Sequence, residues 1–341
     1  MNLGVLLSPG DSLTKQSQFG QLERLVTYYL KPYAAAFDKV FLFSYGDKNF
    51  NGILPAGVKL VTRPWPKEVI NRVNVFRVFQ AVGGLPAVFS GKPFVVTYGY
   101  EYPGFAFLEG KWLIALAMKL ILTLVLFRAK KIIITTKDSL SLIKPWQDKA
   151  VLIPNGVDPN VFKPALPAGR PGGIRDSWLV LSVGRLVKQK NHQRLIETVA
   201  HSKYREKIKL VIIGRGPLKS DLRSLAIKLK VNLKIIDNLP HRQLVGWYQK
   251  AAIFSLTSFA EGQSKALLEA MACGCATLTT QFSGNPAGGL PETELTTELD
   301  KLISSESLRR ERGVEGRNLI VKKFNLPKLV KKEINLLKSC A

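Results

Sequence analysis

In the first half of the chain, apolar residues fall into short runs separated by longer mixed segments. Such runs of Val, Ile, Leu and Phe are typical of strands buried on both faces of a parallel sheet. The intervening segments have the spacing of helices, notably Gln21–Ala36 and Lys111–Phe127. The expected strands are Asn2–Leu7, Val40–Phe43, Val58–Val61, Phe94–Thr97, Lys131–Thr135 and Ala150–Ile153.

The same alternation restarts after Lys163–Gly173, a stretch dense in Pro, Gly and Ala that is typical of a linker. The expected strands of this second half are Trp178–Val183, Lys209–Ile213, Leu233–Ile236, Ile253–Leu256 and Ala276–Thr279. Helices are expected between them, at Gln193–Ser202, Pro217–Leu229, Arg242–Lys250 and Ser264–Cys273. The pattern predicts an α/β chain of two Rossmann-like domains, residues 1–165 and 166–324, facing each other across a cleft.

One of the expected helices is unusually apolar. Between Trp112 and Phe127 only Lys119 and Thr123 are polar, and basic residues flank the segment. At about 1.5 Å per residue it is roughly 24 Å long, shorter than the ~30 Å hydrocarbon core of a bilayer. We therefore expect a helix buried between the sheet and the neighbouring domain. The alternative is a helix lying in a membrane interface, with its basic flanks on anionic headgroups.

The chain is strongly basic. Its 341 residues include 50 Lys and Arg against 25 Asp and Glu, which gives a formal net charge of +25. Such an excess favours an anionic partner: a phosphorylated small molecule, an anionic membrane surface or a nucleic acid. The basic residues are not interleaved with aromatic ones and no zinc-finger spacing occurs, so no nucleic-acid partner is expected.

The cysteines and the first residues bear on location. Cys273 and Cys275 are too close in sequence for an ordinary disulfide, which favours a reducing compartment. Residues Met1–Ser8 lack a basic leader and are typical of a core strand, not of a signal peptide. We therefore expect a cytoplasmic protein, with peripheral contact at the inner face of the plasma membrane as a further expectation.

The densest chemical signal is the stretch EGQSKALLEAMACG, which begins at Glu261. Glu261 lies in the loop after an expected strand and Glu269 lies in the helix that follows, so both can face one cleft. The backbone N–H groups of Gln263, Ser264 and Lys265 are the unpaired donors of that helix start and suit hydroxyl or phosphate oxygens. Two carboxylates suit sugar hydroxyls, whereas two ordinary glutamates favoured by the helix dipole are the alternative.

These motifs resemble the retaining glycosyltransferases of family 4, which have the GT-B fold. The resemblance covers nearly the whole chain and is carried by EGQSKALLEAMACG, by SVGRLVKQKN at 182–191 and by GRGP at 214–217. It implies that Glu261 contacts the transferred sugar and that Glu269 binds the ribose of the donor. It also implies that Arg185 and Lys190 clamp the diphosphate, where cations take up the charge of the leaving group.

The resemblance implies further contacts. Asn238 and Leu239 lie where relatives hold the nucleotide base, and residues 325–341 are expected to pack back on the first domain. The donor contacts implied in addition to the four above are Gly20, Gly184, Gly214, Gly216, Asn238, Leu239, Gln263, Ser264 and Lys265. Many relatives have a histidine on the acceptor side where this chain has none, and Tyr100 or Glu101 is expected to take its place.

No Asp-x-Asp triplet occurs in the chain, and its three histidines form no ligand cluster in the sequence, so neither a metal nor another cofactor is expected. The expected function is a metal-independent, retaining hexosyl transfer from a UDP- or GDP-linked sugar to a hydroxyl acceptor. A lipid-linked acceptor or a cell-surface glycan precursor fits this expectation. The alternative is a non-catalytic basic protein on the same fold that binds membranes or nucleic acid.

Overall fold

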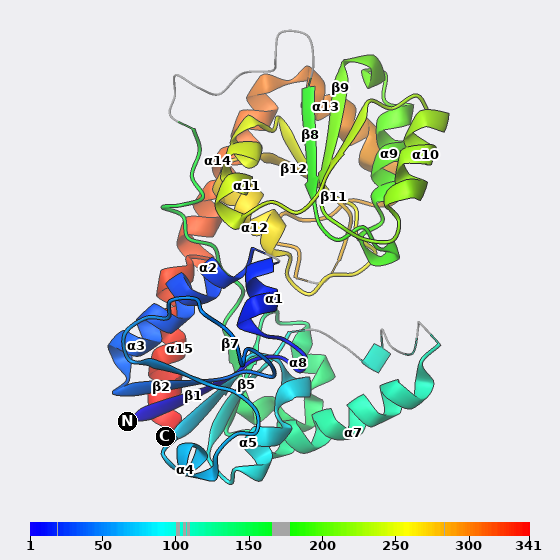
Figure 1. The fold of residues 1–341 in the computed structure, drawn as a ribbon. Coiled ribbons are helices and arrows are strands. Elements are labelled where there is room, and N and C mark those ends of the chain that lie inside the picture. Colours follow the sequence, from blue (N-terminus) through cyan, green and yellow to red (C-terminus); the bar gives the residue numbers. More distant parts are fainter. Residues whose placement is uncertain (19, 100–102, 105–106, 108–109, 166–177, 283) are drawn as a thin grey trace. The chain divides into compact units, whose positions relative to one another are not determined.

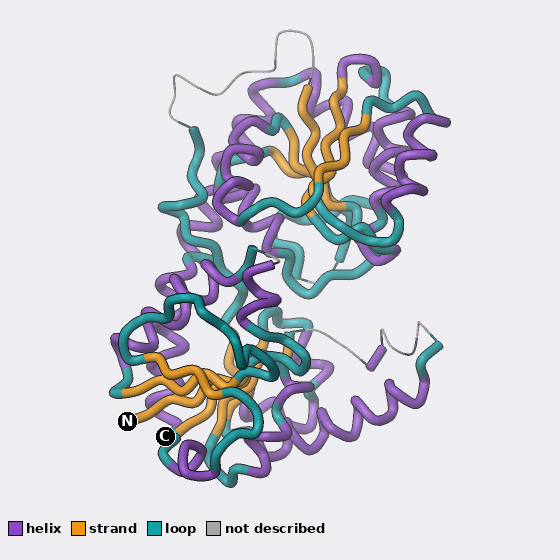
Figure 2. Tube along the Cα trace, viewed as in Figure 1, coloured by secondary structure: helices purple, strands orange, loops and turns teal. Residues whose placement is uncertain are grey.

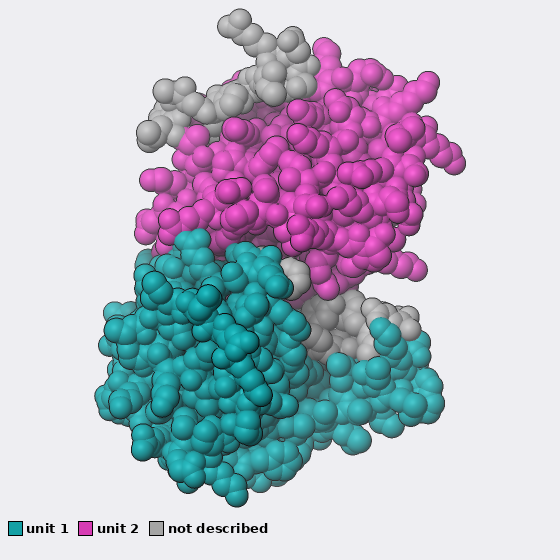
Figure 3. Space-filling view, viewed as in Figure 1, with its two compact units in different colours: residues 1–154, 327–341 teal, residues 155–326 magenta. Residues whose placement is uncertain are grey.

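The structure is a computed structural model of residues 1–341 and describes residues 1–18, 20–99, 103–104, 107, 110–165, 178–282 and 284–341. The chain folds into two compact units (Figure 3): unit 1 comprises Met1–Pro154 and Pro327–Ala341, and unit 2 comprises Asn155–Leu326. In each unit the strands gather at the centre with helices around them (Figure 2). Each unit therefore has its own sheet and its own hydrophobic core.

Among the described residues of unit 1, seven parallel strands form one sheet in the order β3-β2-β1-β4-β5-β6-β7 (Figure 1). The chain builds outward from β1 through β2 and β3, then reverses to β4, which is the strand order of a Rossmann fold with an added strand. The strands are β1 (Asn2–Leu6), β2 (Lys39–Phe43), β3 (Val58–Val61), β4 (Val75–Val78), β5 (Phe94–Tyr98), β6 (Lys131–Ile134) and β7 (Ala150–Leu152).

Helices of unit 1 connect these strands, and the last helix of the chain returns to the same sheet. A π-helical turn at Val26–Leu30 joins α2 to α3, so the helix predicted over Gln21–Ala36 is continuous but not uniformly α-helical. The helices are α1 (Leu13–Gln18), α2 (Leu22–Leu25), α3 (Lys31–Ala36), α4 (Lys67–Asn71), α5 (Leu85–Phe89), α7 (Trp112–Arg128), α8 (Ser139–Leu142) and α15 (Leu326–Cys340).

Unit 2 contains a second parallel sheet, whose five described strands run in the order β10-β9-β8-β11-β12. The strands are β8 (Trp178–Val183), β9 (Ile208–Ile213), β10 (Leu233–Ile236), β11 (Ile253–Leu256) and β12 (Ala276–Thr279). The helices are α9 (His192–His201), α10 (Lys219–Lys228), α11 (His241–Lys250), α12 (Lys265–Ala272), α13 (Leu295–Ser304) and α14 (Glu306–Lys323). The α/β expectation of two Rossmann-like units is confirmed.

The sequence missed one strand, the central β4. Its residues Val75–Val78 include Arg77, a charge that interrupts the apolar run expected of a buried strand. In the structure Arg77 is buried and donates to Glu333 of α15 at 2.7 Å, far away in the sequence. The buried strand tolerates the positive charge of Arg77 only because the Glu333 carboxylate, distant in the sequence, pairs with it.

The chain enters unit 2 earlier than residue 165, where the sequence placed the end of the first domain. Val157 and Phe162 are buried in the core of unit 2, and Arg317 of α14 donates to the carbonyl of Phe162 at 2.7 Å. The backbone N–H of Val157 also donates to the carbonyl of Phe324 at 2.9 Å. These contacts assign the segment after Pro154 to unit 2, although its composition resembles a linker only further on.

The expectation that the apolar helix is buried is wrong for much of α7. Its buried residues are Ala115, Leu122, Val125 and Leu126, and the last three belong to the core of unit 1. Among the other apolar side chains, Leu113 is 63% exposed and Leu120 is 66% exposed. The helix is apolar on more than one side, and unit 1 covers only one of them. Among the described residues, no helix has the length and apolar character needed to cross a membrane.

Candidate functional site

Several predicted site residues of unit 2, though not Glu269, come together at one end of its sheet. The order β10-β9-β8-β11-β12 reverses between β8 and β11, and in such sheets ligands bind beyond the carboxyl ends of the strands at this switch point. Two loops leave the sheet there. The loop after β8 contains Gly184, Arg185 and Lys190, and the loop after β11 contains Glu261.

Hydrogen bonds join these two loops. The Thr257 hydroxyl donates to the carbonyl of Asn191 at 2.8 Å, and the backbone N–H of Phe259 donates to the carbonyl of Gln189 at 3.0 Å. The Gln189 side chain in turn donates to the carbonyl of Ala260 at 2.8 Å. Asn191 has the left-handed backbone conformation, with a φ of 46°, and its side chain caps α9. The two loops are therefore held together by hydrogen bonds.

Lys190 and Glu261 form an ion pair between the two loops. Their side chains are 12% and 11% exposed, so the pair is largely withdrawn from water. The Ser258 hydroxyl donates to the same carboxylate oxygen of Glu261 at 2.9 Å. The exposed guanidinium of Arg185 donates to the Gln189 side chain at 3.4 Å. Three of the four predicted key residues, Arg185, Lys190 and Glu261, thus share one hydrogen-bonded cluster.

Gly214 and Gly216 allow the loop after β9 to lie against the loop after β8. A Cβ at Gly214 would meet the carbonyl oxygen of Gly184 at 1.9 Å, and one at Gly216 would meet the carbonyl oxygen of Leu186 at 2.3 Å. Both distances are too short for any side chain. The backbone N–H of Leu186 donates to the carbonyl of Arg215 at 2.8 Å, which fixes the approach. The glycines are therefore required by packing of backbone on backbone.

Glu269 lies elsewhere, inside unit 2. It is 4% exposed, and its carboxylate accepts hydrogen bonds from His241 at 2.8 Å and from the Tyr248 hydroxyl at 3.0 Å. Burial, together with the nearby Glu269 charge, raises the pKa of Tyr248 well above its ordinary value, so Tyr248 stays a hydrogen-bond donor. Glu269 is therefore engaged with α11, and its role at the donor ribose stays a prediction.

The helix start after Glu261 is also occupied by internal contacts. The Gln263 side chain accepts from the backbone N–H of Asn155 at 2.5 Å, and the Gln263 carbonyl accepts from the Asn155 amide at 3.0 Å. Ser264 is the N-cap of α12 and accepts from the backbone N–H of Leu267 at 3.5 Å, while Lys265 is exposed. Gln263 and Ser264 thus hold the loop after β11 in place.

Asn238 and Leu239 follow β10, the edge strand next to β9, at the same end of the sheet. The preceding residue, Asp237, accepts from the Lys219 ammonium at 2.7 Å and lies 3.8 Å from Arg215. The hydrogen bond from Lys219 lowers the pKa of Asp237 below its ordinary value. This turn is therefore tied to the turn that contains Gly214 and Gly216.

Buried His192 stands directly behind the loop after β8. Its ring nitrogens lie 3.5 Å from the Ser182 hydroxyl and 3.3 Å from the carbonyl of Arg185. Burial lowers the pKa of His192 to about 4, and the positive charge of Lys190 lowers it further against the opposing effect of the Arg185 carbonyl. His192 is therefore neutral near pH 7 and supports the backbone of Arg185 without adding charge.

Gly20 lies in unit 1, where its φ of 67° is the left-handed conformation that glycine adopts readily. Nearby, Asp47 holds the start of α1 through hydrogen bonds from the backbone N–H groups of Leu13 and Thr14. Gly20 thus lies in a turn that requires a left-handed backbone conformation, and its contact with the donor stays a prediction. The acceptor-side candidates Tyr100 and Glu101 lie outside the described residues.

The sequence did not single out Gln189 and Thr257, which join the two loops, or Ser258, which holds the Glu261 carboxylate. Only their position in the sequence could have indicated them, because polar residues that follow neighbouring parallel strands meet at one edge of the sheet. Among the residues that the structure describes, no three His, Cys, Asp or Glu side chains are grouped so as to hold a metal ion. Metal independence stays an expectation.

Comparisons with known proteins agree with this geometry. Residues 170–288, which span both loops, match the family model described as glycosyl transferases group 1. Over its whole length the chain resembles the crystal structure of Anabaena HepE in complex with UDP and glucose, with a TM-score of 0.75, 16% identity and coverage of 99% of this chain and 100% of that one. This structural likeness shows the fold, and the family match covers the part of the chain that contains both loops.

Two curated relatives refine the comparison. The chain is 38% identical over 111 residues to N-acetylgalactosamine-N,N'-diacetylbacillosaminyl-diphospho-undecaprenol 4-alpha-N-acetylgalactosaminyltransferase of Campylobacter jejuni, covering 31% of this chain and 28% of the relative. It is 29% identical over 286 residues to UDP-Gal:alpha-D-GlcNAc-diphosphoundecaprenol alpha-1,3-galactosyltransferase of Escherichia coli, covering 74% and 70%. The first match thus spans less than a third of its relative's length.

Proposed function

We propose that the chain is a retaining, metal-independent glycosyltransferase of family 4 that transfers a sugar from a UDP- or GDP-linked donor to a hydroxyl acceptor. The observation that carries the proposal is the contact between Lys190 and Glu261 at the switch point of the unit 2 sheet. A cation and a carboxylate side by side match the two ends of the reacting bond, a diphosphate leaving group and a sugar carbon that gains positive charge.

Each residue of the cluster has a part in this reaction. Arg185 and Lys190 bind the diphosphate and stabilise its charge as the glycosidic bond breaks. Glu261 contacts the sugar, and Ser258 holds the carboxylate in position through its 2.9 Å hydrogen bond. Glu269, backed by His241 and Tyr248, binds the ribose, and Asn238 with Leu239 receives the base.

The acceptor is proposed to be lipid-linked. The names of two relatives, from Campylobacter jejuni and Escherichia coli, specify acceptors carried on diphosphoundecaprenol. A lipid-linked acceptor has to be met at a membrane surface, which agrees with a net charge of +25 and with the proposed cytoplasmic location, peripheral on the inner face of the plasma membrane.

Purified protein with UDP- and GDP-linked sugars tests the proposal. We expect release of nucleoside diphosphate that persists in EDTA, that depends on an added lipid-linked hydroxyl acceptor, and whose product keeps the anomeric configuration by NMR. Glu261→Gln should lower the turnover strongly, whereas Arg205→Ala, at the amino end of β9 and away from the cluster, should not. Absence of turnover with every donor would favour the non-catalytic basic protein instead.

A further inference from the structure

Helix α7 carries a second apolar surface that unit 1 does not cover. Its exposed residues Leu113, Leu116, Leu120, Leu124 and Phe127 recur every three or four positions and form one line along the helix, here called the outer stripe. They are between 39% and 66% exposed. At about 1.5 Å per residue the outer stripe is roughly 21 Å long.

The outer stripe lies opposite the residues that hold α7 in the protein. With about 100° of rotation per residue, Leu122, Val125 and Leu126 point to one side of the helix and the outer stripe points to the other. Figure 1 shows α7 running along the margin of unit 1, with its first turns extending from the body of the unit. A continuous apolar line on a protein surface marks a place where another apolar phase is contacted.

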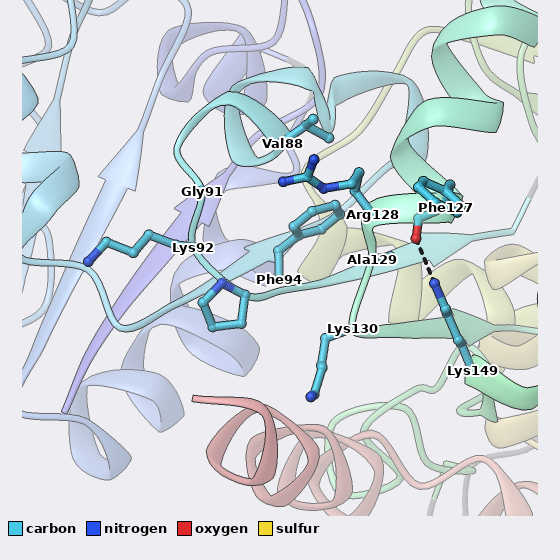
Figure 4. A pocket seen from close by; sticks show the side chains of 10 residues that line it. Val88, Gly91, Lys92, Phe94, Phe127, Arg128, Ala129, Lys130 and Lys149 are labelled. Carbon is cyan, nitrogen blue, oxygen red and sulfur yellow. Dashed lines mark hydrogen bonds between the residues drawn. The ribbon is translucent and has the colours of Figure 1, made fainter.

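A basic pocket adjoins the end of this stripe. It has a volume of about 390 Å³ and is lined by the basic residues Lys92, Arg128, Lys130 and Lys149 together with apolar ones. None of its described lining residues carries a carboxylate. Figure 4 shows the guanidinium of Arg128 reaching across the opening toward Gly91. The pocket lies at the amino ends of β5 and β6, so it is distinct from sites at the carboxyl ends of the strands.

Phe127 connects the pocket to the outer stripe. It is the last residue of the stripe, it is 63% exposed, and it also lines the pocket. The Lys149 ammonium donates to the Phe127 carbonyl at 2.6 Å and lies 5.7 Å from the centre of its ring (Figure 4). Phe89, which follows the pocket residue Val88 in sequence, is 79% exposed. Apolar anchors and cations are thus interleaved at one corner of unit 1.

We propose that the outer stripe and the basic pocket form one docking surface for a bilayer that contains anionic phospholipids. Helix α7 lies in the interface with the outer stripe among the acyl chains, and the pocket receives the phosphate of an anionic headgroup. Interfacial helices of this kind enter the bilayer by only about 5–10 Å. Lys111 at the start of α7 and Arg128 at its end reach the headgroup layer from both ends.

Charge decides between a bilayer and a second copy of the chain as the occupant of this surface. Two copies that met through their outer stripes would bring the cations at the ends of α7 together, and like charges oppose such a contact. An anionic bilayer satisfies both the apolar stripe and its basic flanks. The inference deepens the proposed function and rests on it, because a lipid-linked acceptor is reached from such a surface.

Vesicle cosedimentation of the full chain, without donor or acceptor, tests the inference. We expect binding to vesicles of phosphatidylcholine mixed with phosphatidylglycerol, weaker binding to pure phosphatidylcholine, and loss of the difference at high salt. Arg128→Gln with Lys130→Gln should weaken binding to the anionic vesicles by roughly thirtyfold, since each cation near such a surface contributes about 1 kcal/mol. Leu120→Ser with Phe127→Ser should weaken binding to both kinds of vesicle by at least about tenfold.

Unit 2 offers matched controls. Lys207→Gln with Lys228→Gln removes the same charge from exposed positions, and Ile227→Ser removes an apolar side chain that is 79% exposed on α10. These variants should bind vesicles as the unchanged protein does, and circular dichroism and melting should verify that every variant is folded. Equal weakening by the control charge pair, or no binding of the unchanged protein at low salt, would overturn the inference.

Two further measurements separate the possible failures. If the Leu120→Ser and Phe127→Ser variant changes the sedimentation mass of the protein but not its vesicle binding, the stripe is a contact between copies and the inference is wrong. Nucleoside diphosphate release from the donor, with a short-chain, water-soluble analogue of the lipid-linked acceptor, should be unchanged in the Arg128→Gln and Lys130→Gln variant. Turnover without vesicle binding therefore refutes the docking surface alone, and vesicle binding without turnover refutes the proposed activity alone.

Discussion

Lys190 and Glu261 determine how the site of unit 2 responds to a ligand. Each side chain is about nine-tenths withdrawn from water, and each has the other as its ionic partner. A partly buried charge that loses its partner raises the free energy of the folded state. A diphosphate that binds Lys190 therefore weakens the ion pair between Lys190 and Glu261. The hydrogen bond from the Ser258 hydroxyl then holds the Glu261 carboxylate in position.

Lys190→Ala tests this coupling through catalysis. Loss of one positioned group that stabilises charge in a transition state commonly lowers kcat by about 10²–10³. We expect a fall of that order in the rate of nucleoside diphosphate release, with Lys207→Ala as the control because Lys207 precedes β9 at the opposite end of the sheet. Unchanged kcat in Lys190→Ala would show that Lys190 serves only the packing of the two loops.

His192 gives the same loop a dependence on pH. Its pKa is about 4 in the folded protein and about 6.5 in an unfolded chain, so the unfolded state binds the proton first as the pH falls. The free energy of unfolding should therefore decrease between about pH 6.5 and pH 4, by on the order of 3 kcal/mol from this group. Urea unfolding over this range should show a shallower pH dependence in His192→Gln, and equal slopes would contradict the assignment.

Among the elements, the close approach of the turns after β8 and β9 depends on glycine. Gly214→Ala would place a Cβ 1.9 Å from the carbonyl oxygen of Gly184, so the backbone must move. We expect a loss of about 1–3 kcal/mol in stability together with weaker nucleotide binding, measured by melting with and without UDP or GDP.

Gly246 provides the control for this substitution. It lies in the middle of α11, and a Cβ there would meet nothing within 4 Å. Gly246→Ala should therefore raise the stability by roughly 0.5–1 kcal/mol, because alanine favours a helix over glycine. A Gly214→Ala protein as stable as the parent would mean that the two turns separate without cost.

Most elements could be predicted because each was a local pattern. The apolar runs of β8, β10, β11 and β12 gave their bounds directly, whereas β4 was missed because Arg77 needs Glu333, which no local pattern shows. Within the site, position after a strand indicated Arg185 and Lys190. The partners of Glu269 could not be predicted, since His241 and Tyr248 reach it only through the packing of α11 on α12.

At the scale of the whole molecule, the length of α7 could be predicted from the sequence, but the elements that surround it could not. Both the side that packs on unit 1 and the outer stripe consist of apolar residues, so periodicity alone does not distinguish them. Which side is covered depends on the shape of the sheet and on α5. The expectation of burial therefore failed because either apolar face of α7 could have packed on unit 1. The face that remains exposed is the outer stripe of the proposed docking surface.

The order of the chain also makes unit 1 discontinuous, because its final element α15 follows the whole of unit 2. Arg77 in the centre of the sheet depends on that element: Glu333 of α15 accepts from Arg77 at 2.7 Å and from the hydroxyl of Tyr33, and the Arg77 side chain is 4% exposed. Without α15 a buried guanidinium loses its counter-charge. Unit 1 is therefore complete only when the last residues of the chain have been added.

Glu333→Ala tests this dependence, and breaking such a buried pair typically costs about 3–5 kcal/mol. We expect unit 1 to unfold at lower urea concentration, measured by hydrogen exchange of the backbone amides of β1 and β4, while exchange in β8 and β9 of unit 2 is unchanged. Arg77→Met combined with Glu333→Leu should recover much of the loss, because no charge is then left buried. If the double variant were less stable than Glu333→Ala, the carboxylate would matter chiefly for Tyr33, and α15 would be held to the sheet by its apolar face alone.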